Sequence, residues 1–420
     1  MNNYRSSILL VVLTVLLSIS LIGLTLANYR YASQNPGGND FLPRWLGTRL
    51  FLLKAQSPYS QQTTAAIQQM TYGRLAHQGE DQVLFVYPFY SIFVFAPFAI
   101  INDFSLARAA WMTVLEVSVV ALGLIGLNLT HWRIPKLLLV LLLLFIALWY
   151  HSVRPVINGN ASVICALFLG LAFIAIRTEH DILAAILLAL STIKPQMVVL
   201  LVIFVLLWSA NHQRWSLFWG YLTSLGFLVA ITSLLIPNWI VQNLRQILSY
   251  PEYTLPGTPG AIFAAWLPGV GSQMGWVLTV FMAGILIWEW RAALDKDFNW
   301  FFWTASLTLV ITNLIGIRTA TANYIALLPA LILVFATWDE RWRGVGRWLV
   351  IASMLLLFFG LWALFINTLQ TGEQPIQSPI MFFPLPLFLL VGLYWIRWWA
   401  THPPRVFLEE MRSFRNSRLG

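Results

Sequence analysis

Charged residues are scarce in this sequence. Of its 420 residues, 10% are Asp, Glu, Lys or Arg and 59% are hydrophobic, whereas about a quarter of a soluble protein is charged. No polar stretch is long enough to form a separate soluble domain. The composition therefore excludes a soluble protein and predicts an all-α polytopic membrane protein.

Cysteine and recognisable catalytic motifs are also scarce. Cys165 is the single cysteine and lies in an apolar span, which excludes an intramolecular disulfide. The chain has no Walker motif, no GxGxxG after a strand and no HExxH. Its six histidines lack the spacing of metal ligands, and most lie at loop edges, where a solvated histidine is the default expectation. We therefore assign no metal-ligating residues and no cofactor, and nothing readable supports a Ser-His-Asp enzyme.

Basic residues outnumber acidic ones, and the formal net charge is +9. In a membrane protein such an excess usually marks cytoplasmic loops. No basic run with interleaved aromatic residues occurs, so we expect no nucleic-acid partner. Many of the 21 tryptophans flank apolar segments, as in an aromatic belt at the membrane interface. Membrane lipids are therefore expected partners.

Thirteen apolar segments divide the chain: 8–27, 85–101, 105–127, 137–150, 161–176, 182–193, 196–208, 217–236, 276–290, 300–317, 324–337, 348–368 and 380–396. The first is longer than a signal-peptide core of roughly 7 to 15 residues, so we interpret it as an uncleaved anchor. If all thirteen crossed the membrane, several Arg-rich loops would lie outside, against the positive-inside rule. Pro88 and Pro97 make 85–101 a poor spanning helix. We therefore expect this segment either to dip in and return or to lie at the membrane interface, which leaves twelve spans and both termini in the cytoplasm.

A helix break is expected at Lys194-Pro195. The apolar stretch 182–208 is too long for one span of a hydrocarbon core of about 30 Å and too short for two full spans. Proline favours two short helices that meet at this point. Short helices ending on one side imply a cavity recessed below the outer surface. Lys194 would then lie at membrane depth, where ionisable groups are usually functional.

The longest polar region is residues 28–84, within the first outer loop 28–104, and Asp40 lies in it behind a Pro-Gly-Gly turn. Its carboxylate can act as a general base toward an acceptor hydroxyl. The alternative is that Asp40 only caps a helix starting near Phe41, because Asp is a favoured N-cap residue.

Two helices are expected in the same loop. Residues 41–53 form an apolar interfacial helix whose Arg44, Arg49 and Lys54 can reach lipid headgroups. A second, more polar helix is predicted near 60–77.

Further polar residues collect in the predicted outer loops: Arg154, Asn158, Asn160, Lys194, Gln196, Arg245, Glu252, Arg318 and Asn323. Cations near a carboxylate can hold a phosphate leaving group and stabilise its developing charge. Arg154 and Arg318 can instead simply reach lipid headgroups. The Pro- and Gly-rich outer loop 237–275 is either a lid over the cavity or a connection. Glu116 lies in mid-span, and we assign it no role.

Five motifs follow one another along the chain: NDFLPRWLGTRLFLLKAQSPY from residue 39, FVYPFYSIFVFAPFAI followed by ARAAW, NGN at 158–160, LALSTIKPQ, and RTATANYIALLPAL at 318–331. The first four, over residues 39 to about 210, carry most of the pattern. Together they resemble glycosyltransferase family 87, the polyprenyl-phosphate-mannose-dependent mannosyltransferase-like proteins of the C-type glycosyltransferase superfamily.

The resemblance implies a lipid-linked sugar phosphate as donor, used on the extracytoplasmic side. Asp40 matches the base of the first outer loop, and Lys194 and Arg318 are the residues best placed to contact the lipid phosphate. The donor tail would lie in a groove between helices. The remaining substrate-binding candidates are Arg154, Asn158, Asn160, Gln196, Asn323 and Tyr324.

Two departures bear on the sugar. The family often has Asn-Gly-Gln where this chain has Asn158-Gly159-Asn160, and often has a His where Asn323 precedes Tyr324.

These observations predict a C-type integral membrane glycosyltransferase with juxtamembrane helices in its first outer loop. It moves a hexose, expected to be mannose, from a polyprenyl-phosphate carrier to a hydroxyl of a lipid or glycan, with inversion. We expect a catalytic module at 1–236 and a second module at 237–420 with a cytoplasmic tail, 399–420. The site faces the outside of the cell membrane. Two alternatives stay open: a transporter or flippase of lipid-linked saccharides, and an inactive scaffold of the same fold.

Overall fold

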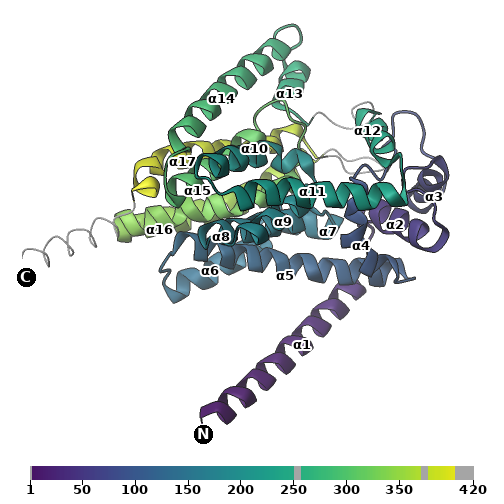
Figure 1. Cartoon of the computed structure of the whole chain (residues 1–420), viewed down its shortest axis with the longest axis horizontal. Helices are drawn as coiled ribbons and strands as arrows, with labels where there is room; N and C mark the ends of the chain where they lie inside the picture. Colours follow the sequence, from purple (N-terminus) through teal and green to yellow (C-terminus); the bar gives the residue numbers. More distant parts are fainter. Residues whose placement is uncertain (1, 250–256, 370–376, 403–420) are drawn as a thin grey trace, which may run out of the picture. The chain divides into compact units, whose positions relative to one another are not determined.

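The computed structural model describes residues 2–249, 257–369 and 377–402. Every regular element in these ranges is helical, which confirms the all-α prediction (Figure 1). The chain divides into two compact units, and each is described by itself. Three of their boundaries fall within α5, α7 and α11, and these helices therefore contribute residues to both units. The predicted modules 1–236 and 237–420 stay a prediction.

Unit 1 comprises residues 1–118, 154–161 and 232–254. Its helices are α1 (Asn2–Gln34), α2 (Leu42–Lys54), α3 (Gln61–Tyr72), η1 (Phe89–Ser91), α4 (Ile92–Ala99), the first part of α5 (Phe104–Thr130), the end of α7 (Tyr150–Asn158), the end of α11 (Trp215–Leu235) and α12 (Trp239–Ser249). The two helices predicted in the first loop are therefore present as α2 and α3.

Unit 2 comprises residues 119–153, 162–231 and 255–420. Besides its parts of α5, α7 and α11, its helices are α6 (Lys136–Leu148), α8 (Ser162–Arg177), α9 (Asp181–Ser191), α10 (Pro195–Asn211), α13 (Pro259–Trp266), α14 (Gly271–Ala293), α15 (Phe298–Thr312), η3 (Thr321–Leu327), α16 (Leu328–Thr368), η4 (Pro379–Phe382) and α17 (Pro384–Thr401).

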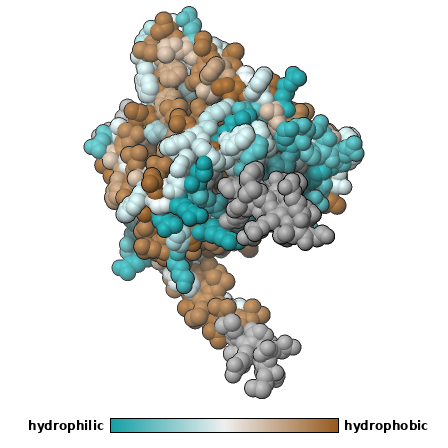
Figure 2. All heavy atoms as spheres, turned by 90° about the vertical axis from the view of Figure 1, so that its left-hand side faces the viewer, coloured by the Kyte–Doolittle hydropathy of each residue, from teal (hydrophilic) through white to brown (hydrophobic). Residues whose placement is uncertain are grey.

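The protein is a multi-pass membrane protein. Six helices of the described residues are long and apolar enough to cross a bilayer, or seven if α6 and α7, bent by 40°, form one broken span. Many large apolar side chains are exposed along them, and apolar surface covers much of the face in Figure 2. Such exposure is typical of helices that face lipid. The number of twelve spans stays a prediction.

Two features agree with the expected helix breaks. Helices α9 and α10 are separate and meet at Ile193–Lys194, as the Lys194-Pro195 break predicts. The 41 residues of α16 are interrupted at Arg343, whose φ of 43° is not helical. This break agrees with the two apolar segments predicted on either side of it.

The segment 85–101 does not form a long helix. It contains η1 and the eight-residue α4, with Pro97 inside α4. Eight residues rise about 12 Å, far less than the bilayer core of about 30 Å. This length agrees with the prediction that the segment does not cross the membrane as one helix.

The prediction that Arg44 and Arg49 of α2 reach lipid headgroups is wrong. Arg44 is 7% exposed, and its guanidinium carbon lies 4.1 Å from the centroid of the Tyr87 ring. Arg49 is half-buried and donates to the carbonyl of Ala99 at 2.8 Å. Arg49 therefore contributes to the packing of α4 against α2, and Arg44 contacts Tyr87 in the segment before η1. Lys54 is exposed.

Candidate active site

Asp40 is half-buried in unit 1 and is held by the Asn158-Gly159-Asn160 turn. The Nδ2 atom of Asn160 donates to Oδ2 of Asp40 at 2.9 Å. The backbone N–H of Asp40 donates to the carbonyl of Asn158 at 3.0 Å. The turn therefore orients both the backbone and the carboxylate of Asp40.

The glycine of this turn is required by its conformation and by its neighbour. Gly159 has a φ of +70°, and a Cβ atom there would lie 2.5 Å from Cβ of Phe41. The ring of Phe41 stacks on Trp111 with centroids 5.6 Å apart, and the Trp111 indole donates to the carbonyl of Gly159 at 2.9 Å. These contacts hold the turn directly beside the residue that follows Asp40.

Asp40 does not act as the N-cap of α2. The N-cap residue is Phe41, no side chain makes a capping bond, and the carbonyl of Gly38 accepts from the N–H groups of Phe41 and Leu42. The capping alternative for Asp40 is therefore wrong. Its carboxylate accepts the hydrogen bond from Asn160 instead of capping the helix.

The Pro-Gly-Gly turn before Asp40 is built around Arg108. This side chain is 2% exposed and donates to the carbonyl of Asn35 at 2.9 Å. A Cβ atom on Gly37 or Gly38 would lie within 3 Å of the Arg108 side chain. Only glycine allows the backbone to pass this close, which explains the two consecutive glycines.

A second carboxylate and a buried cation share the surroundings of Asp40. Asp81 keeps solvent contact, but desolvation raises the pKa of its carboxyl and the Asp40 carboxylate adds to the rise. The Arg44 guanidinium opposes this rise. Among the described residues Arg44 forms no ion pair, and its Nε has no hydrogen-bond partner. Reasoning from sequence assigned neither residue to the site, although Arg44 follows Asp40 by four positions.

Unit 2 contains a polar cluster around Lys194 and η3. Lys194 is 4% exposed, and its Nζ donates to Oδ1 of Asn323 at 2.8 Å. Nδ2 of Asn323 donates to Oγ1 of Thr319 at 3.3 Å, and this hydroxyl donates to Oδ1 of Asn313 at 2.6 Å. The break between α9 and α10 thus places the buried ammonium of Lys194 beside η3, the segment that precedes α16. Lys194 and Asn323, both predicted site residues, meet here.

Further bonds hold the start of η3. Ser162 at the start of α8 donates to the carbonyl of Ala322 at 2.7 Å, and Nδ1 of His151 lies 3.1 Å from the carbonyl of Thr321. His151 is fully buried, and its Nε2 has no partner in the described part of the chain. The default expectation of a solvated histidine is therefore wrong for His151.

The other candidates occupy different surroundings. Tyr324 donates to the carbonyl of Phe382 at 2.8 Å and is fully buried. Arg318, in unit 2, is half-buried and packs against Gly257, whose carbonyl accepts from the Thr319 N–H at 2.8 Å. Gln196 lies in the first turn of α10 and Arg154 in the unit 1 part of α7, and both are half-buried.

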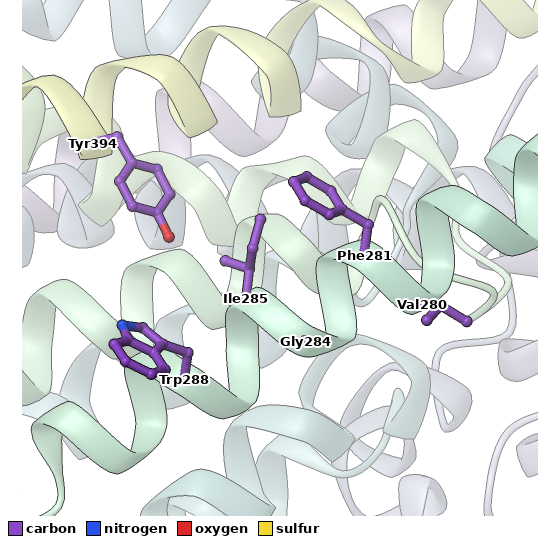
Figure 3. Close-up of a pocket in the computed structure, with 6 residues that line it drawn as sticks. All are labelled: Val280, Phe281, Gly284, Ile285, Trp288 and Tyr394. Carbon is purple, nitrogen blue, oxygen red and sulfur yellow. The ribbon is translucent and has the colours of Figure 1, made fainter.

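The two described pockets lie in unit 2 and contain none of these residues. One, of about 350 Å³, is lined by residues of α14 with Tyr394 of α17 (Figure 3). Val280, Phe281 and Trp288 on its wall are more than 60% exposed. It is therefore an open groove in an apolar surface. Among the described residues, no group of three or more metal-ligating side chains occurs.

The family model described as glycosyltransferase family 87 matches residues 85–315, more than half of the chain. The chain belongs to glycosyltransferase family 87. This membership confirms the resemblance at the level of the family and indicates a membrane glycosyltransferase. Comparisons with curated proteins and with solved structures give no match. The match ends at residue 315, so Asn323 of the polar cluster in unit 2 lies outside it.

Proposed function

We propose that this member of glycosyltransferase family 87 transfers a hexose, mannose by preference, from a polyprenyl-phosphate carrier to a hydroxyl of a lipid or glycan. The reaction takes place on the extracytoplasmic face of the cell membrane, with both chain termini in the cytoplasm. The observation that carries the proposal is the hydrogen bond from Asn160, which lies within the family match, to Asp40, which lies before it. It orients one carboxylate oxygen, Oδ2.

Asp40 is the proposed general base. Its carboxylate takes the proton of the acceptor hydroxyl as the acceptor oxygen forms a bond to the anomeric carbon. The bond between that carbon and the phosphate oxygen breaks, and the electron pair leaves with the polyprenyl phosphate. Attack from the face opposite the phosphate inverts the anomeric centre. The proton on Asp40 then passes to solvent.

Lys194 and Arg318 are the proposed phosphate-binding residues. Burial of the Lys194 ammonium strengthens its attraction to the negative charge that develops on the phosphate, because the protein interior screens charge poorly. Asn323 orients the Lys194 ammonium through the bond of 2.8 Å. Arg154, Asn158, Gln196 and Tyr324 complete the proposed substrate-binding set.

The test uses protein purified in detergent with a synthetic polyprenyl-phosphate mannose and an extract of membrane lipids as acceptor. We expect release of polyprenyl phosphate together with a new mannosylated product, and loss of both in Asp40→Asn. Asp295→Asn is the matched control, because Asp295 is exposed and, within the described part of the chain, forms an ion pair only with the adjacent Lys296. Transfer that persists in Asp40→Asn contradicts the proposed base.

The same assay separates the rival functions. A flippase of lipid-linked saccharides needs two compartments, so turnover in detergent without a sealed vesicle argues against it. An inactive scaffold gives no turnover in detergent and none in vesicles.

A further inference from the structure

Helix α12 has an unusual distribution of side chains. Five of its apolar residues are 39 to 75% exposed: Ile240, Val241, Leu244, Ile247 and Leu248. At about 100° per residue, they fall within an arc of about 120° on one side of the helix. The polar residues Asn243 and Gln246 are 5% and 8% exposed on another side. A helix on a water-exposed surface has the opposite arrangement, with its apolar side buried.

Three amides of α12 bind the first loop of unit 1: those of the buried Asn243 and Gln246 and of the half-buried Gln242. Nδ2 of Asn243 donates to the carbonyl of Tyr87 at 3.1 Å. Oε1 of Gln246 accepts from the N–H of Val86 at 3.0 Å, and Oε1 of Gln242 accepts from the hydroxyl of Ser57 at 2.7 Å. These bonds satisfy polar groups that would be costly to bury alone. They leave the apolar side of α12 facing away from unit 1.

The exposed apolar side continues a membrane span. α12 begins four residues after the end of α11, a candidate span whose Leu234 and Leu235 are 84% and 49% exposed. The Trp239 indole donates to the Ser233 hydroxyl at 3.1 Å and ties the start of α12 to the last turn of α11. The lipid-facing surface of α11 therefore leads directly into α12.

The charge of α12 also suits a lipid surface. The helix has no acidic residue, and its one cation, Arg245, is exposed beside the apolar arc. Arginine at such an edge can place its stem along acyl chains and its guanidinium among lipid phosphates.

We propose that α12 lies in the plane of the membrane interface, with its apolar arc among the lipid acyl chains, and that its buried amides anchor residues 57–87 of the first loop to the membrane surface. The partner is the bilayer itself. This inference is independent of the reaction proposed above, since it concerns lipid contact alone.

The test places a nitroxide spin label at Leu248→Cys in a Cys165→Ala background, because Cys165 is buried and is the single cysteine. The protein is reconstituted in vesicles of phosphatidylcholine and phosphatidylglycerol. Collisions of the label with oxygen, which concentrates in lipid, are compared with collisions with a water-soluble nickel chelate. Two references accompany it: Leu16→Cys in the α1 candidate span, where Leu16 is 55% exposed, and Gln62→Cys on the exposed side of α3.

We expect the label at residue 248 to favour oxygen over the nickel chelate, as at residue 16, and the label at residue 62 to show the reverse. Nickel accessibility at residue 248 equal to that at residue 62 overturns the proposal. Low accessibility to both probes also overturns it, because the arc is then covered by protein, such as a second copy of the chain.

A second variant tests the anchoring. In Leu244→Ser/Leu248→Ser, we expect the Val86 amide to exchange with deuterium several-fold faster in vesicles, because α12 holds it through Gln246. The matched variant Gln61→Ser/Gln62→Ser changes two exposed residues of α3 and leaves this rate unchanged. Unchanged exchange in the α12 variant contradicts the anchoring role.

Discussion

The ammonium of Lys194 donates to Oδ1 of Asn323, 129 residues later in the chain, at 2.8 Å. The first residue lies at the break between α9 and α10, and the second lies in η3. A cation buried at this depth needs polar partners, because burial removes its hydration. The pair therefore joins two segments of unit 2, and its ammonium is a group that can bind an anion.

Replacing Lys194 by Met tests this pair. We expect a loss of about 1–3 kcal/mol in the free energy of unfolding, because the Asn323 oxygen loses its charged donor in a buried site. The proposed phosphate contact would be lost as well, which raises the KM for a polyprenyl-phosphate sugar. Lys136→Met is the control, since Lys136 is exposed at the start of α6. Thermal unfolding and transfer rates together measure both effects, and an unchanged KM contradicts the phosphate role.

Asp40→Asn separates chemistry from folding. The variant side chain keeps an oxygen that can accept the Asn160 bond, so we expect the melting temperature to stay close to that of the wild type. Loss of a general base typically costs about 10²- to 10⁴-fold in rate. The measurement is kcat in detergent with the fold checked by circular dichroism. A fall in activity explained by unfolding would show instead that Asp40 is structural.

Gly159→Ala tests the turn that holds Asp40. The positive φ costs about 1–2 kcal/mol for a residue with a Cβ atom, and the contact of 2.5 Å with Phe41 adds to that cost. Gly73→Ala is a closely matched control, because Gly73 has the same φ of +70° and no atom within 4 Å of a Cβ. We expect a clearly larger loss of stability at residue 159, together with lower activity. Equal losses at both sites show that the Phe41 contact relaxes at no cost.

Arg44 and Tyr87 form a testable pair inside unit 1. The guanidinium lies 4.1 Å from the ring centroid, a geometry worth about 0.5–2 kcal/mol. A double-mutant cycle with Arg44→Met and Tyr87→Leu measures this coupling from the unfolding free energies. Additive effects of the two substitutions show that the contact contributes nothing.

The bond between Glu80 and Arg74 predicts a pH dependence in the first loop. Bonds from the Arg74 side chain and from the N–H of His77 lower the pKa of Glu80 to about 2. The folded-state pKa is below the ordinary value of about 4.3, so the stabilisation is complete above that value and disappears as the pH falls toward about 2. Hydrogen exchange of the His77 amide, compared between the wild type and Glu80→Gln, reports it. The difference between the two proteins should be constant above about pH 5 and vanish near pH 2.

The sequence by itself determined the class of the protein and the location of its main breaks. Its low charge and long apolar runs require lipid around helices, since water cannot solvate them. Prolines indicated the break before Pro195 and the short helices of 85–101, because proline removes a backbone donor and clashes with the preceding turn. The order of short motifs led to the family that the comparison supports.

Only the tertiary structure decided which polar side chains are buried and what they contact. Arg44 and His151 looked like residues at an interface or a loop edge, yet packing buries both. The bond between Asp40 and Asn160 joins residues 120 positions apart, and α12 binds the first loop through amides that its local sequence does not mark. Local sequence sets helix periodicity and turns, but burial depends on long-range contacts that no local pattern encodes.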